Sequence, residues 1–319
     1  MERLIEKWPA KISETRIGAS KEEGGTRSKA LKIGGESTLP FLHSEGEMPN
    51  PPAMALEVWD EIPEEWPFIA NELKAVVNDP VAWVKKAEEY KPDIICLRLA
   101  SCHPDRKNNP PEYAAELVKK ILKTTSLPLM IIGCGHAEKD ADVLPGAAEA
   151  GKGEKLLLGM ATSANYKTIS ATALSCGHSI IAESPLDINL AKQLNILISD
   201  MGLPLERIVM HPTTGGLGYG LDYCYSIMER SRLAGLQGDK IMGVPIVNMV
   251  AQESWKAKET KASQEEQPSW GPLKERGIAW ESACAIAYLQ AGSNILVLGH
   301  PESVKIVKVT IDRLMAHSL

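Results

Sequence analysis

The sequence predicts an α/β protein, a (β/α)8 TIM barrel with an N-terminal β-hairpin extension. Strand-like apolar runs alternate with helix-like runs eight times along the 319 residues, which is the repeat of such a barrel. Most strand-like runs are continuously apolar, as parallel strands covered on both faces are. A doubly wound open sheet is the alternative, but no unit carries a G-x-G-x-x-G turn after the first strand. We therefore expect a hairpin and lead-in loop over residues 1–52 and the barrel over residues 53–319.

The hairpin is predicted from two extended runs, Lys11–Ala19 and Arg27–Gly35, which flank a segment containing Gly24-Gly25. Because it precedes the repeat, we expect it to plug or cap one end of the barrel. The following segment, residues 36–52, contains four prolines and is expected to form an ordered loop.

The eight barrel units follow in order. Strands are expected at Met54–Trp59, Ile94–Leu99, Leu129–Ile132, Leu156–Met160, Ser179–Ala182, Ile208–Met210, Pro245–Val250 and Asn294–Leu298. The first helix is marked by Asp79, a plausible N-cap, before a proline at the first helical position. Helices are expected at residues 79–90, 111–124, 140–150, 166–176, 187–201, 221–236, 281–290 and 302–316. Right-handed crossovers would place all strand ends on one face, where function is expected.

Composition excludes several classes of protein. The formal net charge of −6 argues against a nucleic-acid-binding protein, which is normally basic. No apolar run reaches the roughly 18 residues of a membrane span, and the first residues lack the apolar core of a signal peptide. We therefore predict a cytoplasmic protein without a membrane or nucleic-acid partner.

The candidate metal ligands do not form a pattern. The six cysteines are scattered without a C-x2-C pair, so neither a zinc site nor an iron–sulfur cluster is predicted in this chain. Histidines follow four strands, but each comes from a different loop and has no carboxylate at a diagnostic spacing: His103, His136, His211 and His300. We predict no metal site and no catalytic residue, because the G-x-S-x-G and H-E-x-x-H patterns are also missing.

The most informative stretch runs from Met210 to Gly220 and contains four glycines in six residues. Glycines at this density permit positive φ angles and let a ligand approach the main chain. Thr213 and Thr214 add hydroxyl groups before a helix begins. The stretch is therefore a candidate ligand-binding loop. A tight strand-to-helix connection with nothing bound is the alternative.

The loop after the seventh strand, residues 251–277, is the longest and carries Trp255 and Trp270, with Trp280 nearby. Tryptophans on a long polar loop pack against something. The sequence leaves open whether they pack on the barrel itself or on a partner subunit. We predict that Trp255 or Trp270 is buried against a partner.

The chain resembles the small subunit of the corrinoid iron–sulfur protein, called the delta subunit in the archaeal acetyl-CoA decarbonylase/synthase complex. The resemblance spans the chain from the hairpin to His300. It rests on six motifs taken together: Lys32–Glu36, Leu39–Phe41, Leu56–Asp60, Asp187–Asn195, Pro212–Gly220 and Arg276–Glu281.

This resemblance implies a heterodimer with a large subunit that carries a [4Fe-4S] cluster and shares a corrinoid (cobamide) with the barrel. The pair would act as a methyl carrier rather than as a catalyst by itself. It would take a methyl group from methyltetrahydrofolate through a separate methyltransferase. It would then pass that group to acetyl-CoA synthase/CO dehydrogenase in the reductive acetyl-CoA (Wood–Ljungdahl) pathway of carbon dioxide fixation. The family is anaerobic and cytoplasmic.

On this reading, the barrel completes the cobamide pocket at the carboxyl ends of its strands. The expected cofactor-binding residues are His211, Thr213, Thr214, Gly215, Gly216, Leu217, Gly218, Tyr219 and Asn248. The alternative function is a stand-alone methyltetrahydrofolate:corrinoid methyltransferase whose barrel binds the pterin. That function needs acidic or amide groups at several strand ends, and the candidates are Asp60, Glu183 and Asn248.

Overall fold

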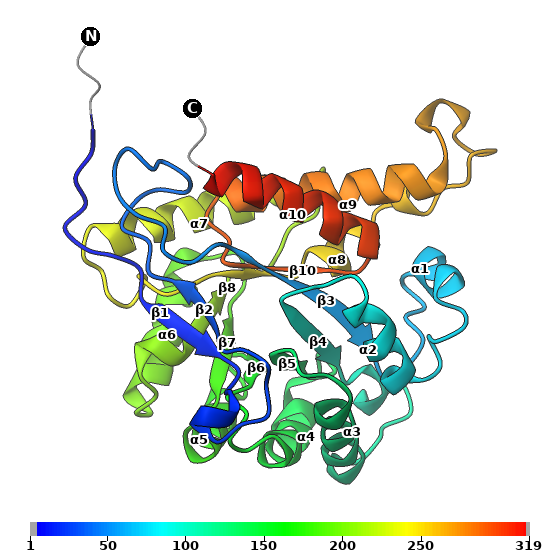
Figure 1. The fold of residues 1–319 in the computed structure, drawn as a ribbon, viewed down its shortest axis with the longest axis horizontal. Helices are drawn as coiled ribbons and strands as arrows, with labels where there is room; N and C mark the ends of the chain where they lie inside the picture. The colour runs from blue at the N-terminus through cyan, green and yellow to red at the C-terminus, as the bar shows by residue number, and fades with distance from the viewer. Residues whose placement is uncertain (1–4, 317–319) are drawn as a thin grey trace.

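The computed structural model describes residues 5–316, and within them eight parallel strands form one sheet (Figure 1). The order is β8-β7-β6-β5-β4-β3-β10-β9. A parallel bridge between Met210 and Ile246 joins β8 to the start of β9 and closes the barrel. The strands are β3 (Ala53–Trp59), β4 (Ile94–Arg98), β5 (Leu129–Ile132), β6 (Leu157–Ala161), β7 (Ser179–Glu183), β8 (Ile208–His211), β9 (Val247–Asn248) and β10 (Ile295–Leu298).

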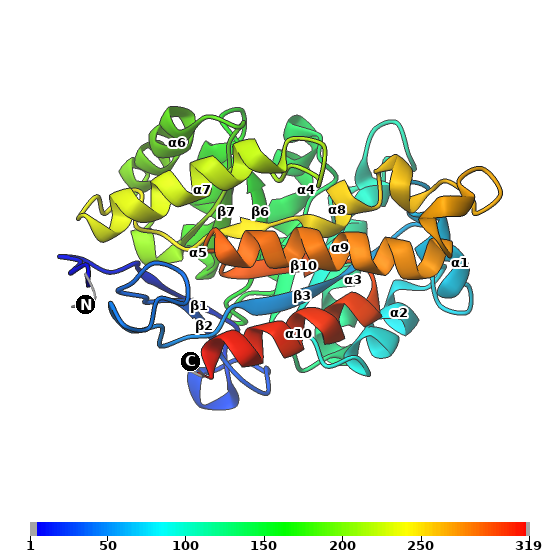
Figure 2. The ribbon, with the colours of Figure 1, turned by 90° about the horizontal axis from the view of Figure 1, so that it is seen from above.

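Helices surround the sheet, and α9 and α10 lie side by side over β10 and β3 (Figure 2). Capping explains several starts: Asp79 Oδ1 accepts a hydrogen bond from Val81 N at 2.9 Å, and Asp187 Oδ1 accepts one from Asn189 N at 2.7 Å. The helices are α1 (Pro67–Glu72), α2 (Pro80–Glu88), α3 (Pro111–Thr124), α4 (Ala137–Ala150), α5 (Tyr166–Cys176), α6 (Ile188–Asp200), α7 (Leu221–Leu236), α8 (Val250–Ser254), α9 (Leu273–Gln290) and α10 (Pro301–Met315).

The barrel prediction is confirmed, with local differences. The strand expected at residues 245–250 is shorter, because Pro245 has no N–H for the ladder and α8 begins at Val250. Helix α9 starts eight residues earlier than expected, at Leu273. The short helices α1 and α8 were not predicted. No helix among residues 5–316 is long and apolar enough to cross a membrane.

Two apolar layers follow from the alternation of side chains along each strand. In β3, Ala53 and Ala55 face the barrel interior, whereas Met54, Leu56 and Val58 face the helices. The interior layer is completed by residues of the other strands, including Met130, Ile181 and Val297. This register puts Glu57 on the interior side of β3, at the end nearest the carboxyl-terminal face.

The hairpin of β1 (Glu14–Ile17) and β2 (Leu31–Gly34) lies at the amino-terminal end of the barrel. Its Ile17 and Ile33 are completely buried and belong to the interior apolar layer, so the hairpin plugs that end. Gly18 N donates to Lys155 O at 2.8 Å, just before β6 begins.

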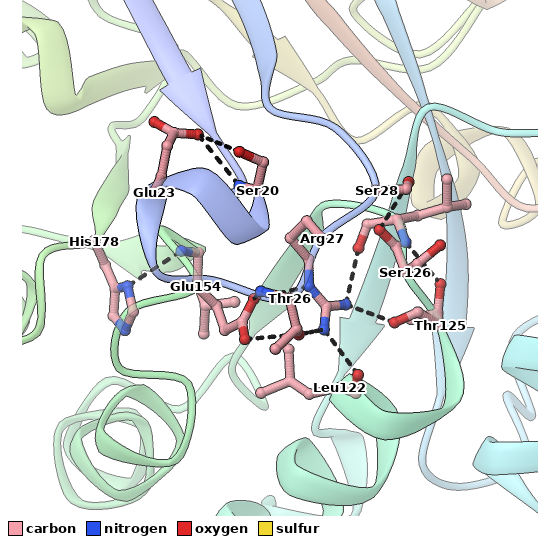
Figure 3. Close-up of polar contacts among 12 residues, drawn as sticks. Ser20, Glu23, Thr26, Arg27, Ser28, Leu122, Thr125, Ser126, Glu154 and His178 are labelled. Atoms are coloured by element: carbon pink, nitrogen blue, oxygen red, sulfur yellow. Dashed lines mark hydrogen bonds and ion pairs between the residues drawn. The ribbon is translucent and has the colours of Figure 1, made fainter.

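A buried polar network fixes the loop between the two hairpin strands (Figure 3). Arg27 is 2 % exposed, and its Nε lies 2.8 Å from Glu154 Oε2. Its Nη1 donates to Thr125 O at 2.6 Å, and its Nη2 donates to Leu122 O at 2.8 Å. Since every nitrogen of the guanidinium finds an acceptor, the charge is buried together with its hydrogen-bond partners.

Candidate functional site

Three adjoining cavities cross the carboxyl-terminal face of the barrel. A cavity of about 560 Å³ lies near β3 and β4, one of about 260 Å³ lies at the centre, and one of about 600 Å³ lies beside β7 and α6. The first two share Arg98, Cys134 and Gln252, and the last two share Thr162 and Glu183. Together they form one trough across the mouth, which we call the mouth trough.

The floor of the mouth trough is a buried ion pair. Arg98 Nε lies 2.5 Å from Glu57 Oε1, and the two side chains are almost completely buried. Trp59 Nε1 donates to the same carboxylate oxygen at 3.1 Å. With its amide oriented to satisfy both polar atoms, the Gln252 side-chain oxygen accepts a hydrogen bond from Arg98 Nη2 at 2.8 Å. These groups close the upper end of the barrel interior.

Trp59 is also contacted by cations. The guanidinium carbons of Arg98 and Arg106 lie 5.5 and 5.7 Å from its ring centroid. Arg106 is held in turn by Glu65, with Nη2 and Oε1 2.6 Å apart. This side of the trough is therefore rich in paired charges.

A second polar group links β7 to the glycine-rich stretch. Glu183 Oε1 lies 3.2 Å from His211 Nδ1, and His211 Nε2 lies 3.1 Å from Thr214 Oγ1. Thr214 Oγ1 accepts from Met249 N at 2.8 Å, so it donates its hydroxyl proton to His211 Nε2 when that nitrogen is unprotonated. Burial raises the pKa of Glu183, but the hydrogen bond and charge of His211 outweigh burial and hold the pKa below its usual value.

The first part of the glycine-rich stretch is buried, and its second part is exposed. Thr214, Gly215 and Gly216 are buried, and Tyr288 Oη donates to Gly215 O at 2.6 Å. A Cβ on Gly215 would lie 2.3 Å from Gly220 O, so only glycine fits there. Positive φ angles occur at Thr213 (47°), Gly218 (77°) and Gly220 (93°) but not at Gly216.

The predicted cofactor-binding residues therefore differ in whether a ligand at the mouth could reach them. Gly218 and Tyr219 are exposed, and Thr213 and Leu217 are half-buried. Of these four residues, Thr213 lines the mouth trough, whereas the other three lie outside its three cavities. His211 lies under the stretch as a positioning residue for Thr214. Asn248 is fully buried with its Nδ2 3.5 Å from Met228 Sδ on α7, so it faces the helix layer rather than the mouth.

Sequence comparison assigns the family. Residues 16–311 match the model of the CO dehydrogenase/acetyl-CoA synthase delta subunit. The chain belongs to this family.

Curated relatives agree with the assignment, and each is named acetyl-CoA decarbonylase/synthase complex subunit delta. The protein from Methanosarcina mazei is 36% identical over 310 residues, covering 95% of this chain and 71% of the relative. The protein from Archaeoglobus fulgidus is 34% identical over 315 residues, covering 97% of this chain and 70% of the relative. This chain is thus related to a subunit of a multi-protein complex.

Solved structures support the barrel fold of this chain. Dihydropteroate synthase from Xanthomonas albilineans, in complex with indole-2-carboxylic acid and 6-chloroguanine, superposes with a TM-score of 0.57 at 15% identity. The superposed region covers 88% of this chain and 100% of the synthase chain. The enzyme from Thermus thermophilus gives a TM-score of 0.56 at 12% identity, with 95% and 100% coverage. At this identity the likeness concerns the fold alone.

The loop that carries Trp255 and Trp270 packs on its own barrel at one position. Trp255 is 1 % exposed, and its ring stacks on His300 with centroids 5.9 Å apart. The prediction that Trp255 is buried against a partner is therefore wrong, because Gly277 of α9 leaves the space that its ring fills. Trp270 is half-buried beside Arg276, and its burial against a partner stays a prediction that the affinity of a Trp270→Ala variant would test.

Sequence reasoning missed the groups on the floor of the trough. Glu57 and Arg98 each interrupt an apolar strand, and a charge in such a run is a signal of a buried pair. Gln252 carries no such signal. Asp60, in contrast, was a candidate ligand but accepts hydrogen bonds from Ser101 N at 2.8 Å and Ser101 Oγ at 2.5 Å, so it braces the loop after β4.

Proposed function

We propose that this chain is the small subunit of a heterodimeric corrinoid iron–sulfur methyl carrier. Its barrel completes the pocket of a cobamide held mainly by a large subunit. The complex takes a methyl group from methyltetrahydrofolate through a methyltransferase and delivers it to acetyl-CoA synthase. The observation that carries this proposal beyond the family assignment is the mouth trough, which crosses the carboxyl-terminal face and is lined at one end by Thr213 of the glycine-rich stretch.

The shape of the mouth fits a flat macrocycle lying across it. The barrel interior below is filled by the Glu57–Arg98 pair and by apolar side chains such as Met130 and Met160. A ligand therefore rests on the mouth and leaves its other face free for a second protein. Such an arrangement matches a cofactor shared between two subunits.

The groups that would contact a corrinoid are Thr213, Leu217, Gly218 and Tyr219. The backbone at Gly218 is open, since a Cβ added there would meet no heavy atom of the described chain within 4 Å, and this allows close approach. When bound, the corrinoid supplies a cobalt ion that accepts and releases the methyl group. The chain's own contribution is to orient the ring and to exclude water from that face.

The methyltransferase alternative is less well supported by the geometry. It requires several acidic or amide groups at the mouth for hydrogen bonds to a pterin ring. Asp60 is occupied by Ser101, and Asn248 faces α7, which leaves Glu183 alone of the three candidates. Tight binding of methyltetrahydrofolate to the isolated chain, measured by calorimetry, would favour this alternative.

Metal analysis tests the carrier proposal. The isolated chain should contain no stoichiometric iron or cobalt, because its sequence lacks the ligand spacing for either. When a tagged form of this chain is purified from its natural source, a larger subunit that contains cobalt and iron should co-purify with it. Four irons per isolated chain, or a tagged chain that retains no cobalt-containing partner, would contradict the proposal.

Gly218→Val tests the contact with the cofactor. A valine there would strain the backbone by about 1–3 kcal/mol and would also place a branched side chain where the ring approaches. We expect the corrinoid affinity of the complex to fall about tenfold, which corresponds to about 1.4 kcal/mol. Cofactor retention on dilution, followed by absorption spectroscopy, provides the measurement.

Gly177→Val is a matched control for this experiment. Gly177 has a φ of 80° and equally open surroundings, but it ends α5 at the opposite end of the barrel. Both variants should lose similar stability, and only Gly218→Val should lose corrinoid. Equal corrinoid affinity in the two variants would show that Gly218 serves the turn alone.

A further inference from the structure

We infer that the cavity beside β7 and α6, here called the β7 cavity, binds a ligand group that has an apolar surface and ends in a primary amide. This inference rests on the proposed function, under which the group is one of the amide side chains at the rim of the corrin ring. Nothing in the family assignment specifies a ligand for this cavity.

The β7 cavity has a volume of about 600 Å³ and a mostly apolar wall. Pro185 and four leucines supply that wall, and the leucines are Leu186, Leu190, Leu194 and Leu197. Leu186 and Leu190 are 40 % and 43 % exposed although they lie at the rim of a concave site. Apolar side chains exposed in a cavity indicate a ligand with an apolar surface.

Two of the polar residues that line the β7 cavity, Glu183 and Ser184, are neighbours at the carboxyl end of β7. Glu183 contributes a carboxylate, and Ser184 is 2 % exposed with an Oγ that has no hydrogen-bond partner within residues 5–316. The main chain of Ser184 is already satisfied: its N donates to His211 O at 3.1 Å, and its O accepts from Thr213 Oγ1 at 2.6 Å. The hydroxyl of Ser184 is thus left for a ligand, and a buried unpaired hydroxyl is costly without one.

This pair of groups matches a primary amide. An amide has N–H donors for the Glu183 carboxylate and a carbonyl oxygen that accepts from the Ser184 hydroxyl. A carboxylate in the same place would be repelled by Glu183. An ammonium group is disfavoured because the mostly apolar wall solvates a cation poorly.

The position of the cavity supports the same ligand. Thr213 lines it, and Thr213 also begins the stretch that faces the proposed cofactor. Glu183 and Thr162 belong both to the β7 cavity and to the centre of the mouth trough. A ring lying across the trough would therefore direct a peripheral side chain toward β7 and α6.

The test compares corrinoids on the complex of this chain with its large subunit. The probes are aquacobalamin and its monocarboxylic acids, in each of which one side-chain amide has become a carboxylate. We expect at least one monocarboxylic acid to bind about tenfold more weakly than aquacobalamin, and Glu183→Gln to remove most of that difference. Affinity is read from the change in corrin absorption, which does not depend on methyl transfer.

Ser184→Ala tests the hydroxyl separately. Since the hydroxyl is buried and has no partner in the described part of the chain, its removal should not lower the thermal unfolding temperature, but it should weaken aquacobalamin binding about tenfold. Ser170→Ala is the matched control, because Ser170 on α5 is also buried with an unpaired hydroxyl among residues 5–316 but lines none of the three mouth cavities. It should not lower the unfolding temperature either, and it should leave aquacobalamin binding unchanged.

The possible outcomes distinguish failure of the proposed function from failure of the amide assignment. If the wild-type complex binds no corrinoid, the proposed function fails and this assignment falls with it. If it binds aquacobalamin and all monocarboxylic acids equally in every variant, only the amide assignment is overturned. A loss of affinity for the cofactor-free large subunit in Ser184→Ala would likewise overturn it, because a partner side chain would then occupy the cavity.

Discussion

Replacing Arg27 with methionine is expected to lower the free energy of unfolding by about 3–5 kcal/mol, the usual cost of breaking a buried ion pair from one side. The substitution leaves Glu154 as an uncompensated carboxylate that is only 8 % exposed. It also removes donors from the carbonyl oxygens of Leu122 and Thr125. Urea unfolding followed by circular dichroism measures the change.

The hairpin supplies its own control for this prediction. Arg16 and Glu23 form an ion pair with the same 2.8 Å separation, but the Arg16 side chain is 45% exposed. Exposed pairs contribute little, so Arg16→Met should change stability far less than Arg27→Met. The double variant Arg27→Met/Glu154→Gln should recover part of the loss, because it removes the stranded charge. Equal losses for the Arg16 and Arg27 variants would show that the network does not anchor the plug.

Arg98→Met is expected to cost a similar amount, about 3–5 kcal/mol, for the same physical reason. It would leave Glu57 charged and enclosed between β3 and β4, with the hydrogen bond from Trp59 Nε1 still in place. Gln252 would lose its donor as well. Because the pair forms the floor of the mouth trough, the variant should also bind corrinoid more weakly in the complex.

A charge-removing double variant distinguishes the two roles of this pair. Arg98→Met/Glu57→Leu replaces both ions by apolar groups, and such replacements are often neutral or stabilising. We expect its free energy of unfolding, measured in urea, to return close to the wild-type value. Its corrinoid affinity should stay reduced if the arginine orients the ring. Recovery of both properties would assign the pair a structural role alone.

The barrel could be predicted from the sequence because its signals are local. Continuous apolar runs such as Leu129–Ile132 and the cap-proline start at Asp79-Pro80 depend on near neighbours in the chain. The loops carry no such periodicity. Helix α8 was therefore missed: five residues give too little pattern, and the helix follows a strand of two residues without a turn signal.

The candidate site was harder to predict, because a one-residue change of register decides which way a side chain points. Asn248 occupies the helix-facing position of β9, whereas its neighbours Val247 and Met249 belong to the barrel interior. Glu57 takes the interior position in β3. The glycine-rich stretch was located correctly at a strand end, but the need for glycine at Gly215 arises from contact with Gly220 O, which composition cannot reveal.

The plug also has a consequence for how the protein is made. Glu36, just after β2, pairs with Arg232 at 2.7 Å and accepts a hydrogen bond from Asn294, 258 residues further along the chain. At translation rates of about 5–20 residues per second, Glu36 is synthesised about 13–52 s before that partner. A lone two-stranded hairpin is at best marginally stable in water. A segment that is translated before the barrel strands is therefore among the last to reach its final place, and its apolar face must stay clear of other nascent chains until the barrel closes around it.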